Sequence, residues 1–378
     1  MEKNEITVIA PINIALIKYW GKRDEERILP FNDSISINID SVYARTKVII
    51  TTEERSDSVV VNGKQVDLKT NARFVQCFRR IRELVGKLPE TARFRVESET
   101  NFPTSAGLAS SAAGFAAIAY GLGKLLGVDT DTISGLARTG SGSACRSIYG
   151  GFVHWIAGEK VDGSDCVCRQ LTPVDHWPSL RAVVVVVNSR VKRDSSTNGM
   201  QRTVETSQLF KHRLTLIPGR IEELKKTIES KDFSKLTEIV IKDSNQLHAV
   251  CADTYPPLFY LSDASSHLID LVHAFNEYNN QSKVAYTFDA GPNCCLLMEE
   301  QTVAEFLPYL CHYCPNRKEG KFIRGPTAPE IHRIRPFSRG DPNVDSEQSN
   351  RWERLMPMPD SVEYVIVSKL GSAPHIID

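Results

Sequence analysis

Residues 103–112 restrict the fold of this chain more than any other segment. They read Pro-Thr-Ser-Ala-Gly-Leu-Ala-Ser-Ser-Ala and open directly into an alanine-rich apolar run that ends near Leu126. A glycine lets the backbone approach an anion closely, and the first turn of a helix offers unpaired N–H groups. The segment therefore predicts a phosphate-binding loop before a buried helix, to which Ser105, Ser110 and Ser111 add hydroxyl groups. A serine-capped helix after an ordinary loop is the alternative.

Two common phosphate-binding motifs are missing from this segment. No Gly-Lys-Ser or Gly-Lys-Thr ends it, as in a Walker A loop, and the Gly-x-Gly-x-x-Gly spacing of dinucleotide-binding folds is missing too. The pattern Pro-x-x-x-Gly-Leu-x-Ser-Ser-Ala instead resembles the phosphate-binding motif of the GHMP kinase superfamily.

The length and charge of the chain narrow the class of protein. A chain of 378 residues suits two globular domains, or one large α/β body with a shared cleft, and we place the two domains at 1–187 and 188–378. Lys plus Arg and Asp plus Glu both number 46, so no overall field favours nucleic acid or an anionic membrane. Nothing resembles a secretory signal, and residues 112–128 are too short to span a membrane. We expect a cytosolic protein that binds neither nucleic acid nor a membrane.

The nine cysteines are expected to be free thiols, because the cytosol keeps thiols reduced. Cys311 and Cys314 form a CxxC pair, but no second CxxC or histidine pair follows it. A structural zinc site needs four ligands at suitable spacing, so we predict none here.

Hydrophobic periodicity predicts mostly strands before Asn188 and mostly helices after it. The valine run at 182–187 reads as a buried strand. Other strands are predicted at 46–52, 58–61, 64–66, 92–98, 284–288, 293–298 and 364–368. Helices are predicted at 71–85, 200–210, 218–229, 233–251, 262–278 and 303–313. Residues 315–361 read as a long surface excursion.

Residues 140–147, Gly-Ser-Gly-Ser-Ala-Cys-Arg-Ser, form a second hydroxyl-rich segment. Glycines and serines can wrap a polyanion through N–H and O–H donors, and Arg146 supplies a planar fork suited to a carboxylate or a phosphate. A solvated loop with a surface ion pair is the alternative.

Two basic segments and one carboxylate complete the set of candidates. Residues 13–22 place Lys18, Tyr19 and Lys22 just after an apolar strand, and residues 192–197 form a basic, hydroxylated cluster after the valine run. Asp289 lies at the end of an apolar strand, beside an Ala-Gly-Pro turn. It would be a common Asx-turn residue on its own. In a cleft lined by phosphate-binding loops it would be a base for a substrate hydroxyl.

Together these segments resemble the mevalonate diphosphate decarboxylase family, from about residue 8 to residue 298. The runs Asn-x-Ala-Leu-x-Lys-Tyr-Trp-Gly and Ser-Gly-Ser-Ala-Cys-Arg-Ser separate it from the sibling kinases. The resemblance implies an enzyme of isoprenoid and sterol biosynthesis that uses Mg-ATP to convert mevalonate 5-diphosphate to isopentenyl diphosphate, with release of CO₂. It also implies an α/β GHMP kinase fold, with an N-terminal half like ribosomal protein S5 domain 2, a ferredoxin-like C-terminal half and a cleft between them. Family members are usually homodimers.

The resemblance assigns roles to individual residues. Asp289 matches the catalytic aspartate, Arg146 the arginine that holds the C1 carboxylate, Lys18 a lysine near the reacting oxygen, and Asn13 a residue that orients Arg146. The positions that match the grip on the 5-diphosphate are Tyr19, Lys22, Ser141, Ser143, Arg193 and Thr197. Those on the ATP phosphate side are Pro103, Ser105, Gly107, Leu108, Ala109, Ser110 and Ser111, with Ser110 or Ser111 reaching Mg²⁺. The alternatives are a GHMP kinase that does not decarboxylate its substrate and a catalytically silent sensor of ligands.

Overall fold

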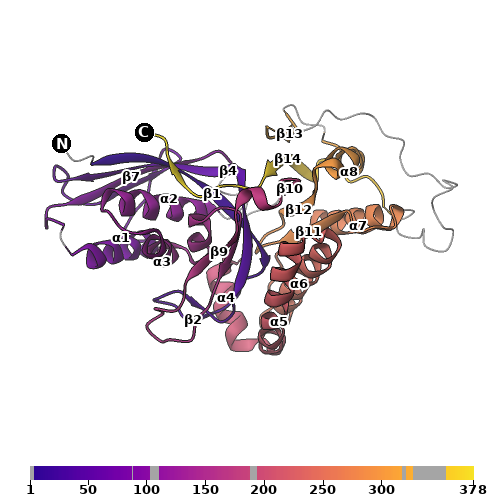
Figure 1. Cartoon of the computed structure of the whole chain (residues 1–378), viewed down its shortest axis with the longest axis horizontal. Helices are drawn as coiled ribbons and strands as arrows, with labels where there is room; N and C mark the ends of the chain where they lie inside the picture. Colours follow the sequence, from indigo (N-terminus) through magenta and orange to yellow (C-terminus); the bar gives the residue numbers. More distant parts are fainter. Residues whose placement is uncertain (1–3, 87, 103–109, 188–193, 317–320, 327–354) are drawn as a thin grey trace.

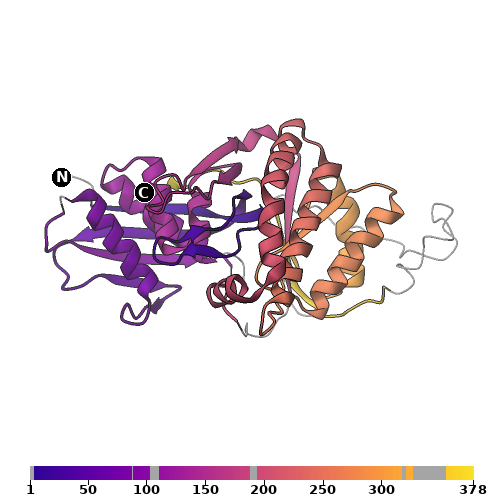
Figure 2. The same cartoon turned by 90° about the horizontal axis from the view of Figure 1, so that it is seen from below.

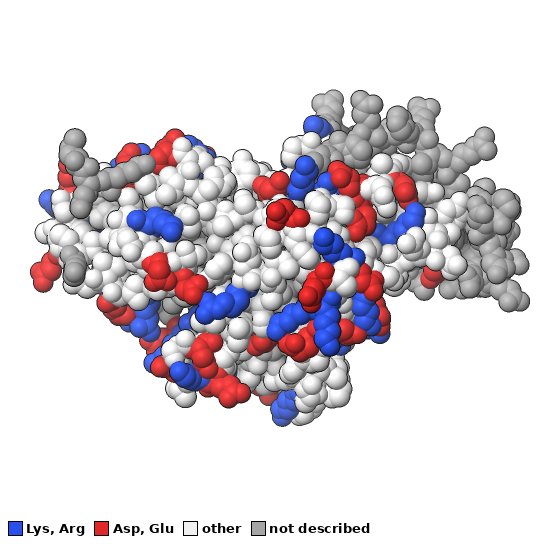
Figure 3. Space-filling model, in the orientation of Figure 1, with Lys and Arg blue, Asp and Glu red and all other residues white. Residues whose placement is uncertain are grey.

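The computed structural model describes residues 4–86, 88–102, 110–187, 194–316, 321–326 and 355–378. Figure 1 shows two α/β halves side by side, each built on its own sheet. The prediction of an α/β chain is confirmed. On the face that Figure 3 shows, acidic and basic side chains lie among one another.

The N-terminal sheet is built around two long antiparallel strands, β1 (Glu5–Ile17) and β4 (Ser34–Thr51). Its other described strands are β5 (Ser58–Val61), β6 (Lys64–Gln65), β7 (Arg93–Thr100), β8 (Phe152–Trp155), β9 (Cys168–Thr172) and β15 (His375–Ile376). The helices α1 (Ala72–Val85), α2 (Ser110–Leu125) and α3 (Thr130–Gly140) cover one face of this sheet (Figure 2). Buried and exposed residues alternate along β7, as expected for a sheet that is covered on one face.

The C-terminal sheet has the order β11, β12, β10, β14, β13. Its strands are β10 (Leu180–Val187), β11 (Val284–Phe288), β12 (Cys294–Glu299), β13 (Ile323–Arg324) and β14 (Val362–Lys369). Its helices are α5 (Gln208–Ser230), α6 (Phe233–Asp253), α7 (Asp263–Tyr278) and α8 (Glu300–Tyr313). Val184 and Val186 pack with α5 and α6, and Val183 and Val185 pack with α7 and α8. Both faces are covered, which explains the unbroken valine run.

The predicted helix start at Pro218 is wrong. Helix α4 (Ser196–Thr206) ends before Ser207. Ser207 has an extended backbone, and its side chain caps the start of α5 by accepting a hydrogen bond from the Phe210 N–H. Pro218 then lies inside α5. Ile217 and Ile221 are buried in the core around it, and this packing outweighs the hydrogen bond that proline cannot make.

Several other predicted boundaries differ from the structure. The strand predicted at 46–52 is only the end of β4, because the buried residues Ile35, Ile37 and Ile39 extend the strand toward its start. Residues 140–147, for which a solvated loop was the alternative, contain the end of α3 and the 3-10 helix η2 (Gly142–Ile148). Strand β10, which we placed in the domain 1–187, pairs within the C-terminal sheet. The domain boundary itself stays a prediction.

Three short elements complete the described chain: β2 (Lys22–Asp24), β3 (Leu29–Pro30) and the 3-10 helix η3 (Val174–His176). All nine cysteines are free. Within the described ranges, no helix combines the length and the apolar character that a membrane span requires. Of the excursion predicted at 315–361, residues 317–320 and 327–354 lie outside the described residues, and β13 pairs in parallel with β14.

Candidate active site

The site is built around the C-terminal end of β1, which carries Asn13 and leads into Lys18. The backbone of Lys18 is fixed on both sides. Its N–H donates to Asp243 Oδ2 over 2.8 Å, and its carbonyl oxygen accepts from Asn32 Nδ2 over 3.0 Å. Asn32 and, from the other half of the chain, Asp243 of α6 hold the Lys18 backbone. The direction of the lysine side chain is therefore set by tertiary packing.

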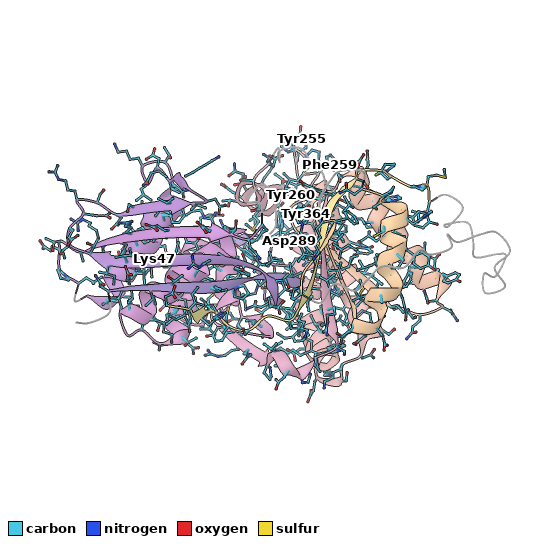
Figure 4. All side chains as sticks on the ribbon, turned by 90° about the horizontal axis from the view of Figure 1, so that it is seen from above. Lys47, Tyr255, Phe259, Tyr260, Asp289 and Tyr364 are labelled. Atoms are coloured by element: carbon cyan, nitrogen blue, oxygen red, sulfur yellow. The ribbon has the colours of Figure 1, made fainter. Side chains whose placement is uncertain are left out.

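The Lys18 ammonium contacts the Asp289 carboxylate, with Nζ 2.6 Å from Oδ1. The lysine side chain is 2% exposed and the aspartate side chain 40% exposed, so a buried cation reaches a carboxylate at the surface of the site. Asp289 follows β11, where the Phe288 N–H donates to Ser244 Oγ and the Gly291 N–H donates to the Asp289 carbonyl oxygen. Figure 4 places Asp289 at the junction of the two halves.

Asp243 accepts the hydrogen bond from the Lys18 N–H and is itself fully buried between two arginines. Its carboxylate lies 2.9 Å from Arg213 Nη2 and 2.9 Å from Arg220 Nη1. Burial alone would raise the pKa of Asp243, but the two guanidinium groups and the Lys18 N–H lower it overall. The sequence reasoning missed this cluster, because no local motif marks an aspartate in the middle of a helix.

Arg146 is buried in η2, and within the described part of the chain its side chain donates hydrogen bonds to neutral partners. Its Nε and Nη2 donate to Asn13 Oδ1 over 3.1 and 2.9 Å, and its Nη1 donates to Ser34 Oγ over 2.7 Å. The guanidinium also lies over the ring of Trp155, 5.7 Å from its centroid. Asn13 is fixed in turn, because its Nδ2 donates to Ser147 Oγ and to the Ser143 carbonyl oxygen. Ser34 and Trp155 were not predicted.

Tyr19 lies beside this cluster. Its ring packs at 4.7 Å from that of Trp155, and its buried hydroxyl has no hydrogen-bond partner among the described residues. Burial raises the pKa of Tyr19, so the hydroxyl stays protonated and can donate to a ligand. Lys22, by contrast, lies beside Glu25, with 2.5 Å between Nζ and Oε2.

The remaining predicted residues fall into three groups. Ser141 Oγ lies 3.1 Å from Ser111 Oγ, which brings the predicted diphosphate and ATP sides into contact. Thr197 is exposed in the first turn of α4, and no hydrogen bond between described residues joins it to the other predicted residues. Arg193, Pro103, Ser105, Gly107, Leu108 and Ala109 lie outside the described residues, and Ser110 begins α2.

His248 is a further residue that the sequence reasoning missed. It lies on α6 one turn after Ser244, with its ring 6.2 Å from that of Phe288, the residue before Asp289. Burial and the charge of Lys18 lower the pKa of His248 to about 4. The imidazole is therefore neutral at physiological pH.

Comparison with known proteins identifies the family. Residues 10–168 match the model of the diphosphomevalonate decarboxylase-like N-terminal domain, and residues 182–377 match that of the mevalonate 5-diphosphate decarboxylase C-terminal domain. The diphosphomevalonate decarboxylase of Bos taurus is 43% identical over 99% of this chain and 94% of its own length.

Solved structures agree with this result. Mevalonate diphosphate decarboxylase from Trypanosoma brucei superposes with a TM-score of 0.87 at 34% identity, over 99% of this chain and 98% of that one. The protein MDDEF in complex with MVAPP, AMPPCP and magnesium superposes with a TM-score of 0.79 at 28% identity, over 99% of both chains. The predicted GHMP kinase fold is confirmed by these structures. The chain belongs to the diphosphomevalonate decarboxylase family.

Proposed function

We propose that this chain converts mevalonate 5-diphosphate and ATP to isopentenyl diphosphate, ADP, phosphate and CO₂, in the mevalonate pathway. Relatives that match this chain over nearly their full length carry the name of this activity. The observation in the chain itself that carries the proposal is the contact between Lys18 and Asp289, beside a buried arginine with neutral partners. Asp289 provides an acid–base group, Lys18 a cation near the reacting oxygen, and Arg146 a group that binds the substrate carboxylate.

Asp289 would act in the first step, the transfer of the ATP γ-phosphoryl group to the 3-hydroxyl of the substrate. Its partly exposed carboxylate accepts the hydroxyl proton or orients that oxygen for attack, while Lys18 fixes the carboxylate by a charge-assisted hydrogen bond. Phosphoryl transfer depends mainly on positioning and on stabilisation of charge. The support of Lys18 by Asp243 therefore contributes to the reaction.

Arg146 would act in the second step, which releases phosphate and CO₂. Phosphate leaves the tertiary carbon of the new ester with the bonding electrons of the C–O bond, and the C1–C2 bond then breaks to release CO₂ and supply the electron pair of the alkene. Asn13 and Ser34 hold three N–H groups of Arg146 on its protein side, so its remaining N–H groups suit the C1 carboxylate. The neutral partners leave the positive charge of Arg146 for the substrate.

The other predicted residues would hold the phosphate groups. Tyr19, Lys22, Ser141, Ser143, Arg193 and Thr197 are proposed for the 5-diphosphate. Pro103, Ser105, Gly107, Leu108, Ala109, Ser110 and Ser111 are proposed for the ATP phosphates. A hydroxyl oxygen is a suitable ligand for Mg²⁺, a hard cation, and the hydroxyl of Ser111 at the start of α2 fits that use. Bound with ATP, Mg²⁺ would neutralise charge on the phosphates.

Three wider assignments belong to the same proposal. The chain divides into domains at 1–187 and 188–378, with the site between them. It acts as a homodimer in the cytosol. Each is an expectation from the family resemblance or from the sequence, and sedimentation of the purified protein and localisation of a tagged chain test the last two.

The decisive experiment supplies mevalonate 5-diphosphate labelled at C1 with Mg-ATP and follows ADP, phosphate and labelled CO₂. We expect all three products. ADP without CO₂ would mean a kinase, and no product at all would mean a silent sensor of ligands.

A further inference from the structure

A cavity of about 280 Å³ lies next to the active site, on another side of η2. Arg138 and Gly135 of α3 line it, together with Cys145 of η2 and Trp155 of β8. None of the roles assigned above uses this space. Its walls nevertheless touch the site directly, because Cys145 precedes Arg146 and Trp155 packs against Tyr19.

Arg138 is the unusual feature of the cavity. Its side chain is about nine-tenths buried, and none of the ion pairs between described residues includes it. Nη1 donates to the Cys166 carbonyl oxygen over 3.0 Å, whereas Nε is buried without a hydrogen-bond partner in the described part of the chain. A buried cation without a counter-charge is costly, so an anion in the cavity would stabilise it.

The other groups on the cavity wall do not supply that counter-charge. Asp131 lines the cavity too, but its carboxylate lies 2.7 Å from Arg169 Nη1 and accepts the Tyr149 hydroxyl over 2.5 Å. Burial raises the pKa of Cys145 and of Cys166, so both thiols are neutral at pH 7. The cavity therefore presents a positive charge with neutral thiols and an indole ring around it.

We propose that this cavity binds a small oxyanion, a phosphate or a carboxylate, on Arg138. The ligand would lie beside the active site, separated from it by Trp155 and by the turn of η2 that carries Arg146. It would be an additional anion site, distinct from those that the proposed reaction uses for the diphosphate and for ATP.

The test measures binding of radiolabelled inorganic phosphate by equilibrium dialysis, without turnover, in the presence of saturating mevalonate 5-diphosphate and AMPPCP. Gly135→Leu fills the cavity and leaves Arg138 in place, since a Cβ at Gly135 meets no atom within 4 Å. Arg138→Gln removes the charge. Gly219→Leu is the matched control, because Gly219 is a helical glycine of α5 that also faces open space. Leucine favours a helix more than glycine does, so both leucine variants should fold.

We expect the wild type and Gly219→Leu to bind one equivalent of phosphate at this site. In Gly135→Leu and Arg138→Gln the affinity for that equivalent should fall at least about tenfold, or 1.4 kcal/mol. Equal phosphate binding by all four proteins, or no saturable difference between wild type and Gly135→Leu, would overturn the proposal. Competition by acetate separates the two ligand classes: displacement identifies a site that accepts carboxylates, and its failure identifies a phosphate site. Because the readout is a binding difference, its failure is distinguishable from a failure of the proposed reaction.

Discussion

The Lys18 ammonium and the Asp289 carboxylate lie 2.6 Å apart, although 271 positions separate them in the sequence. Lys18 follows β1 of the N-terminal sheet, and Asp289 follows β11 of the C-terminal sheet. The contact therefore joins the two halves of the chain at the point where the proposed chemistry takes place. Its geometry depends on how the two halves pack.

Asp289→Asn should lower kcat by roughly 10²- to 10⁴-fold, which is the usual loss when a positioned acid–base group is removed. The amide keeps the shape of the side chain but has no charge for Lys18. Steady-state kinetics and circular dichroism check the result, with the exposed Asp175→Asn as control. Near-normal turnover would remove Asp289 from the mechanism.

Arg146→Ala should sharply reduce turnover and leave the affinity for ATP largely intact. The side chain binds Asn13 and Ser34, and its remaining donors are proposed for the substrate carboxylate. Calorimetric titration with AMPPCP, next to turnover measurements, separates the two effects. A selective loss of nucleotide binding would instead place Arg146 on the ATP side.

Asn13→Asp should raise KM for mevalonate 5-diphosphate by about tenfold or more, equivalent to 1.4 kcal/mol. The new carboxylate would neutralise Arg146 and lose the hydrogen bond to the Ser143 carbonyl oxygen. Asn276→Asp is a suitable control, because the Asn276 side chain likewise donates through Nδ2 and accepts through Oδ1, but with backbone groups away from the site. An unchanged KM would show that the charge of Arg146 is not used in binding.

The free energy of unfolding should fall as the pH is lowered from about 6.5 to about 4, and His248 should contribute to this fall. Burial lowers the pKa of His248 from its ordinary value of 6.5 to about 4 in the folded chain. Within that window the unfolded chain binds the proton and the folded chain does not, so acid favours unfolding. The effect should approach about 3 kcal/mol.

Denaturant unfolding at a series of pH values tests the contribution of His248. His248→Gln should flatten the dependence on pH in this window, whereas the exposed His212→Gln should not. Identical curves for wild type and His248→Gln would contradict the neutral, buried state of the imidazole.

Asp243→Asn should destabilise the chain by about 3–5 kcal/mol, because it leaves the fully buried Arg213 without its counter-charge. It should also lower turnover, since Asp243 fixes the Lys18 backbone. Chemical denaturation measures the first effect. Glu97→Gln breaks an exposed ion pair with Arg95 and should leave stability unchanged. A similar result for both variants would mean that the Asp243 cluster has no special role.

Local sequence patterns were sufficient to predict residues at the centre of the site. Asn13, Lys18, Arg146 and Asp289 each lie in a segment with a recognisable combination of residue types, and the structure places Asn13 against Arg146 and Lys18 against Asp289. Their catalytic roles stay predictions. The alternating strands and the valine run were likewise visible, because burial on one or both faces leaves a periodic pattern.

The supporting residues could not be predicted in this way. Ser34, Asp243 and His248 lie within a long strand or a helix, and each reaches the site through contacts with residues more than 100 positions away or on another element. No spacing in the sequence marks such contacts. The continuous path of α5 through Pro218 was missed for the same reason, since the packing of Ile217 and Ile221 is a tertiary effect.

The ratio of labelled CO₂ to ADP in a single turnover of mevalonate 5-diphosphate labelled at C1, with Mg-ATP, tests the proposed reaction most directly. If Asp289 and Arg146 act in successive steps of one reaction, the wild type should release one CO₂ for each ADP. Formation of ADP with no CO₂, and accumulation of a phosphorylated substrate, would contradict the proposed decarboxylation.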